Sequence, residues 1–86
     1  MSYCVRLKRR AIKGLAALPA NIRRDLAARI EVLREDPFPH SVARLDQDFA
    51  GFYKLRVGDY RIIYAVDESR HAVVIVRVGH RHNVYK

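Results

Sequence analysis

Residues 52–64, with the sequence FYKLRVGDYRIIY, constrain the fold more than any other part of the chain. Apolar side chains occupy every second position on both sides of Gly58-Asp59, which is the spacing of half-buried strands. A glycine supplies the positive φ angle that a tight hairpin turn requires. We therefore predict a two-strand hairpin that turns at Gly58-Asp59.

A two-residue turn also fixes which side chains share a face of this hairpin. The predicted pairs are Val57 with Tyr60, Arg56 with Arg61, Leu55 with Ile62 and Tyr53 with Tyr64. One face then carries apolar and tyrosine side chains, and the other carries Lys54, Arg56 and Arg61, with Ile63 opposite Lys54. Like charges directly opposite one another destabilise a sheet, so we interpret the cationic face as a binding site for an anion.

Length and charge narrow the possible partners. The chain has 86 residues and a net charge of +8, so we expect a single domain, residues 1–86, with an anionic partner. Nucleic acid, an acidic protein and an anionic membrane are the candidates. A membrane-binding helix would separate its basic and apolar faces, whereas these basic residues are spread over helices and strands, so nucleic acid ranks first.

The chain carries no sign of membrane insertion or export. Its longest apolar run, residues 72–76, is too short to span a bilayer. The N-terminus MSYCVRLKRR lacks the apolar core of a signal peptide. The lone Cys4 allows no intramolecular disulfide, as is usual in a reducing compartment. We expect a cytoplasmic protein that does not bind membranes.

The flanking segments predict the rest of the fold. Residues 3–7 alternate as a short strand, and two segments with helical spacing, residues 9–17 and from Pro19 to about Glu35, predict a helical hairpin. Residues 41–51 have no clear pattern. Residues 72–78 are apolar on both faces apart from one arginine, which is typical of a central strand. The order β-α-α-β-β-β predicts an α+β domain with the helical hairpin on one face of a small, mostly antiparallel sheet.

The C-terminal tail GHRHNVYK adds groups that can move protons. It follows the last predicted strand directly, so it can fold back beside the cationic face. The sequence has no HExxH, no paired cysteines, no P-loop and no GxSxG, and its carboxylates show no cluster suited to Mg²⁺. We therefore predict no metal site and no cofactor.

Metal-free cleavage of RNA is chemistry that such a set of residues can support. The 2′-hydroxyl must lose a proton, the 5′-oxygen must gain one, and the charge developing on the phosphate must be stabilised. Lys and Arg suit the last task. Tyr has a free pKa of about 10, which nearby cations lower, whereas a His titrates closer to neutral pH. The residues leave the proton-transfer group open between Tyr85 and a histidine.

The stretches FYKLRVGDYRIIYAVD and VVIVRVGHRHNVY, preceded by a basic helical hairpin, closely resemble the RelE toxins of bacterial toxin–antitoxin systems. The resemblance covers nearly the whole chain. It implies a RelE-like fold and an mRNA interferase that enters the ribosomal A site and cuts the codon there. It also implies a cognate acidic antitoxin of the RelB type, with mRNA on the 70S ribosome and rRNA as the other partners.

The resemblance further implies a role for each site residue. Lys54, Arg56 and Arg61 correspond to phosphate-binding positions, Arg81 to the acid at the leaving group and Tyr85 to the base. The segment between Arg81 and Tyr85 is shorter than in the best-known member of the family. His80 adjoins Arg81 and is a further candidate for proton transfer.

Two other functions are compatible with the sequence. A ParE-like inhibitor of DNA gyrase would share the fold without being an enzyme, but it does not need the set of Lys, Arg and Tyr residues. A catalytically silent basic module would bind nucleic acid with a steep salt dependence and without toxicity.

Overall fold

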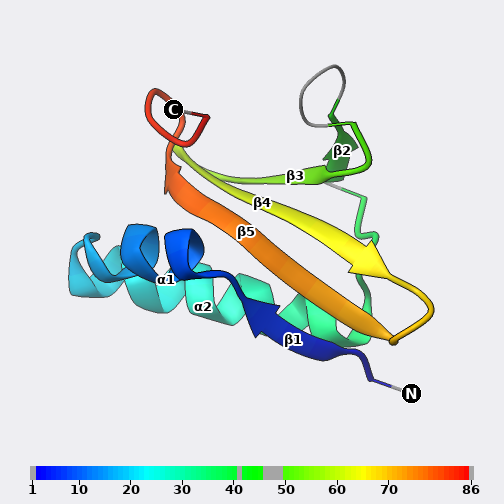
Figure 1. The fold of residues 1–86 in the computed structure, drawn as a ribbon. Helices are drawn as coiled ribbons and strands as arrows, with labels where there is room; N and C mark the ends of the chain where they lie inside the picture. The colour runs from blue at the N-terminus through cyan, green and yellow to red at the C-terminus, as the bar shows by residue number, and fades with distance from the viewer. Residues whose placement is uncertain (1, 41, 46–49, 86) are drawn as a thin grey trace.

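A computed structural model describes residues 2–40, 42–45 and 50–85. Its elements are β1 (Cys4–Leu7), α1 (Arg9–Ala16), α2 (Ala20–Glu35), β2 (Val42–Arg44), β3 (Tyr53–Val57), β4 (Tyr60–Asp67) and β5 (Ala72–His80). The strands form one sheet in the order β1-β5-β4-β3-β2, in which β1 runs parallel to β5 and the other neighbours are antiparallel. Figure 1 shows both helices on one side of this sheet. The predicted fold class is confirmed.

The central hairpin has the predicted register. Val57 pairs with Tyr60 and Arg56 pairs with Arg61. The other two predicted pairs, Leu55 with Ile62 and Tyr53 with Tyr64, are also present. Gly58 has a φ of 60°, the left-handed conformation that favours glycine at this turn. The turn therefore sets the order of side chains on both faces of the sheet.

The core lies between the apolar face of the sheet and the helices. Leu26, Ile30 and Leu33 form the buried stripe of α2, as helical spacing predicts. Opposite them, the sheet contributes a buried group that includes Ile62 and Tyr64. The opposite face of the sheet, which we call the open face, is left without a helical layer (Figure 1).

Helix α1 covers the part of β5 that β1 leaves unpaired. β1 pairs with β5 only from Ala72 to Ile75. Beyond that point α1 approaches so closely that a Cβ atom on Gly14 would lie 2.1 Å from the backbone oxygen of Val78. Only glycine allows this contact, which holds the C-terminal end of β5 against α1.

Two features of the sheet were not predicted from the sequence. The strand β2 lies within residues 41–51, where we saw no pattern, and it pairs with β3 from Val42 to Arg44. Three residues are too few to show a strand period. The second feature is a bulge, which shifts the register of β4 and β5 between Ile63 and Tyr64. Residues 41 and 46–49 lie outside the described part of the chain, and neither described helix could cross a membrane.

Candidate functional site on the open face

The strand register brings the predicted cations onto the open face. Two rows of directly opposed residues cross this face, Lys54–Ile63–Arg77 and Arg56–Arg61–Gly79. Successive side chains of a strand point to opposite faces, and the intervening pairs, such as Leu55 with Ile62, belong to the core. The three predicted cations of the hairpin therefore share a face, as expected.

Arg61 differs from its neighbours because it is buried. Only 7% of its surface is exposed, whereas Arg56 is exposed and Lys54 is half-buried. Its Nη1 atom donates to the backbone oxygens of Gly58 and Tyr60, each at 2.8 Å. Its guanidinium thus folds back onto the hairpin turn. A guanidinium has five N–H donors, and both bonds use the same nitrogen.

The C-terminal turn folds back over the open face, as predicted (Figure 1). The N–H groups of Asn83 and Val84 both donate to the backbone oxygen of His80, at 2.8 and 2.9 Å. Val84 is only 4% exposed and contacts the open-face side of Gly79, where a Cβ would lie 3.8 Å from it. Arg77 Nη1 donates to the Val84 oxygen at 3.3 Å. The turn is thereby fixed beside the row that contains Arg61.

Arg81, the first residue of the C-terminal turn, contacts the same hairpin turn. Its backbone N–H donates to the oxygen of Asp59 at 2.8 Å, and its Nε lies 4.0 Å from Asp59 Oδ1. Because both side chains are largely exposed, this ion pair stabilises the fold weakly. The two-residue turn therefore holds Arg61 through the Gly58 oxygen and Arg81 through the Asp59 oxygen.

Tyr85 lies at the end of the C-terminal turn. It directly follows the buried Val84 and is 40% exposed. The turn thus leaves Tyr85 partly exposed to solvent. The structure therefore brings Lys54, Arg56, Arg61, Arg81 and the turn that carries Tyr85 to one end of the sheet.

His80 is the predicted site residue that lies apart from this group. It pairs with Tyr60, a residue packed against the core, so its side chain belongs to the helix side of the sheet. The two rings meet edge to face at 5.5 Å. His80 Nδ1 accepts a hydrogen bond from the His82 N–H at 3.2 Å, which places the proton of a neutral ring on Nε2.

Comparison with known proteins shows to which family the chain belongs. Residues 5–85 match the ParE toxin family of type II toxin–antitoxin systems, parDE. The chain belongs to the RelE/ParE superfamily of toxins. The toxin is 37% identical over 89 residues to toxin RelG of Mycobacterium tuberculosis. The alignment covers 100% of this chain and 99% of RelG. It is 27% identical to putative toxin RelE1 of Methanocaldococcus jannaschii, over 100% and 98% of the two chains.

Solved structures agree with this assignment. The toxin superposes on the RelBE2 toxin–antitoxin complex of Mycobacterium tuberculosis with a TM-score of 0.85 and 32% identity, covering 94% of this chain and 100% of that chain. For the RelE–RelB complex of the archaeon Pyrococcus horikoshii the TM-score is 0.80 and the identity 28%, over 98% and 100% of the chains. The fold is therefore that of RelE toxins.

Arg77 lies beside the candidate site, although it was not among the predicted site residues. It was noted only as the single charge in an apolar strand. The strand period could not reveal its face, because the bulge shifts the register between Ile75 and Arg77. Arg77 faces Lys54 across Ile63 and holds the C-terminal turn.

The described residues offer the site cations and a phenol rather than metal ligands. Among them, no three His, Cys, Asp or Glu side chains gather closely enough to hold a metal ion. Asp59 is the acid that contacts this group, through Arg81. The arrangement offers positive side chains that can bind a phosphate, and the neighbouring C-terminal turn carries Tyr85.

Proposed function

We propose that the toxin is a ribosome-dependent endoribonuclease that cleaves mRNA in the ribosomal A site without a metal ion and so blocks translation. The observation that carries this proposal is the convergence of the hairpin cations with Arg81 and the Tyr85 turn at one end of the open face. The likeness to RelE and RelG toxins supports it.

The cations are close enough together to hold one phosphate. Side chains directly opposite one another in an antiparallel pair have Cβ atoms about 5 Å apart, and alternate residues of a strand are about 7 Å apart. Arg56 and Arg61 are such a pair, and Lys54 is the neighbour of Arg56 on the same strand. Arg61 is already fixed by its bonds to the hairpin turn, so little reorganisation accompanies phosphate binding.

The proposed reaction is an in-line displacement at phosphorus. The 2′-oxygen bonds to phosphorus as the bond to the 5′-oxygen breaks, which leaves a cyclic phosphate and a free 5′-hydroxyl. Tyr85, as the phenolate, takes the proton from the 2′-hydroxyl and becomes the neutral phenol. Arg81, or a water bound to it, delivers a proton to the departing oxygen. We prefer Tyr85 to His80 as the base because His80 belongs to the helix side of the sheet.

An acidic antitoxin is the expected protein partner. The solved relatives are toxin–antitoxin complexes, and a net charge of +8 favours fast association with an acidic chain. An antitoxin segment that folds as it binds could cover the open face and neutralise its cations.

Cleavage of mRNA on programmed ribosomes tests the proposal. Arg81→Ala and Arg56→Ala each remove one positive group, and loss of such a group lowers kcat by roughly 100-fold or more in comparable sites. Arg24→Ala, on the exposed side of α2, removes the same charge away from the site and should cleave close to the wild-type rate. If Arg81→Ala and Arg56→Ala also cleave at that rate, the site assignment is wrong.

A gyrase inhibitor is the second candidate, favoured by the match to the ParE toxin family. The two functions give different first effects on expression in cells. An immediate fall in protein synthesis supports the ribonuclease. DNA breaks and an SOS response that precede any fall in translation support the gyrase inhibitor.

A further inference from the structure

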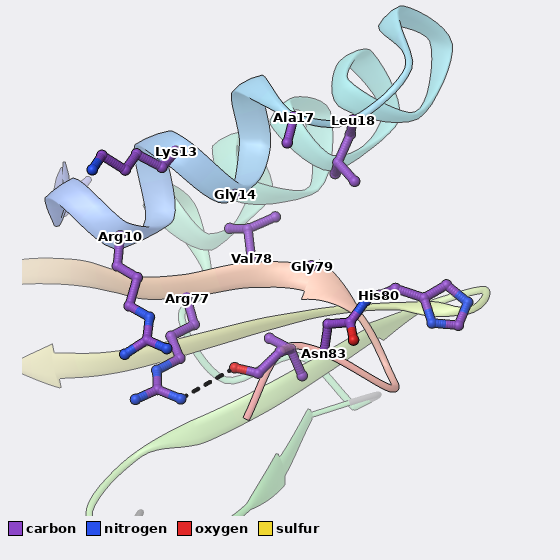
Figure 2. Close-up of a pocket in the computed structure, with 11 residues that line it drawn as sticks. Arg10, Lys13, Gly14, Ala17, Leu18, Arg77, Val78, Gly79, His80 and Asn83 are labelled. Carbon is purple, nitrogen blue, oxygen red and sulfur yellow. Dashed lines mark hydrogen bonds between the residues drawn. The ribbon is translucent and has the colours of Figure 1, made fainter. Parts of the chain in front are cut away.

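A groove of about 540 Å³ runs between α1 and the C-terminal end of β5 (Figure 2). Three elements line it: α1 contributes Arg10 and Lys13, β5 contributes Arg77, and the C-terminal turn contributes Asn83. Its volume is in the range that accommodates a ligand of nucleotide size. The groove lies at the edge of β5, with α1 and Val78 on the helix side and Arg77 on the side of the open face. Nothing in the proposed cleavage step uses it.

The charge of the groove is entirely positive. The eleven residues that line it include three Lys or Arg side chains and no Asp or Glu. Arg10 and Lys13 are three residues apart on a helix, which places them on the same side of α1. In Figure 2 the side chains of Arg10 and Arg77 extend toward the same end of the groove from α1 and β5. Cations that converge from two elements suit an anionic ligand.

One wall of the groove is apolar. Ala17 and Leu18 directly follow α1, and Val78 comes from β5. Asn83 adds an amide that can both donate and accept hydrogen bonds. A phosphate on the cations, with a ribose or base against the apolar wall, would use both parts of this lining.

Arg77 joins the groove to the candidate site. It lies in the same row of the open face as Lys54, and it also lines the groove. Its bond to the Val84 oxygen holds the turn that separates the two regions. A nucleic acid strand on the open face can therefore continue past the C-terminal turn into the groove without leaving positive potential.

We infer that this groove is a second nucleotide subsite, which holds a phosphate of the RNA strand near the scissile linkage. The inference rests on the proposed function and extends it, because it states where the strand goes beyond the cleaved bond. Arg10 and Lys13 are binding residues in this proposal rather than catalytic ones.

The test couples a change in the protein to a change in the RNA. The double variant Arg10→Ala/Lys13→Ala and the wild-type toxin are assayed on programmed ribosomes, with mRNAs shortened one nucleotide at a time on either side of the A-site codon. On full-length mRNA we expect the double variant to lose roughly tenfold in kcat/KM. Once the mRNA is short enough to lack the contacted phosphate, the kcat/KM of the wild type should fall to that of the double variant. The kcat/KM of the double variant should not fall further.

A matched control removes two charges from elsewhere. Arg24→Ala/Arg29→Ala lies on the exposed side of α2 and should show the same response to mRNA length as the wild type, whatever its overall rate. Thermal melts of all variants should coincide, because the four side chains are exposed. If the alanine pair does not fold, Lys13→Gln alone should still show a smaller response to length than the wild type.

Three results would overturn the inference. If wild type and Arg10→Ala/Lys13→Ala respond alike to mRNA length, the subsite is wrong while the ribonuclease stands. If the wild type cleaves no mRNA, the ribonuclease and the subsite fall together. If the double variant binds an acidic antitoxin peptide less tightly but keeps the wild-type response to length, the groove serves a protein partner instead of RNA.

Discussion

Replacing Arg61 by lysine would keep the positive charge on the open face but remove the two hydrogen bonds that tie the guanidinium to the hairpin turn. In the wild type, Nη1 reaches the oxygens of Gly58 and Tyr60 at 2.8 Å each. Arg61 is nearly buried, so water cannot easily replace a lost bond. We therefore expect Arg61→Lys to lower the stability of the fold.

The size of the effect follows from the bonds. A hydrogen bond to a charged group contributes about 1.5–3 kcal/mol. A single Nη1 makes both bonds and lysine can restore part of one, so we expect a loss of about 2–3 kcal/mol for Arg61→Lys and more for Arg61→Ala. In a domain of this size, each kcal/mol shifts the melting temperature by about 4–8 °C. Arg61→Lys should therefore melt roughly 10–20 °C below the wild type.

Urea and thermal unfolding, followed by circular dichroism on toxin freed from its antitoxin, measure this difference. Arg56→Ala is the matched control, because it removes the exposed partner directly opposite Arg61. It relieves a repulsion between like charges and should change stability by no more than about 0.5 kcal/mol. Two results would refute the reasoning. One is a melting temperature for Arg61→Lys within about 2 °C of the wild type, which is less than 1 kcal/mol on the scale of about 4–8 °C per kcal/mol. The other is a loss of stability in Arg56→Ala equal to that in Arg61→Lys.

Three further changes have definite expected outcomes. Gly14→Ala places a Cβ 2.1 Å from a backbone oxygen of β5, so overpacking should cost about 1–3 kcal/mol in urea unfolding despite better helix propensity. Tyr64→Phe removes the hydroxyl that donates to the Pro37 oxygen at 2.6 Å, and calorimetry should show a loss of about 1–3 kcal/mol. A hydrogen bond from the Ser69 hydroxyl lowers the pKa of Asp67. The stability that this adds over Asp67→Asn should be present above about pH 4 and disappear as the pH falls through the folded-state pKa, in melts compared across pH.

The sequence was sufficient to predict the parts of the fold that depend on local geometry. A two-residue turn with a glycine leaves one register for the hairpin, so the pairing of Arg56 with Arg61 followed from spacing alone. The stripe of α2 followed from its helical period. These two features were enough to place the hairpin cations on the face away from the helices.

Features that depend on tertiary packing could not be read in the same way. The bulge adds one residue to β5 opposite the step from Ile63 to Tyr64, and an added residue reverses which later side chains face the core. Counting from Ile75 by twos puts Arg77 on the helix side, whereas the structure puts it on the open face and His80 on the helix side. The burial of Arg61 likewise depends on backbone oxygens of the turn, which have no sequence signature.

The hairpin turn connects the stability of the toxin to the arrangement of its candidate site. Arg61 lies in β4 and Arg81 follows β5, yet each is held by a backbone oxygen of the Gly58-Asp59 turn. Because these contacts are made to the main chain, the conformation of the turn matters more than the Asp59 side chain, whose pair with Arg81 is long and exposed. A glycine at φ 60° thus fixes the register, the buried cation and the start of the C-terminal turn together. Loss of toxicity in variants of this turn can therefore arise from displacement of both arginines, whereas the exposed Arg56 can be replaced without removing either contact.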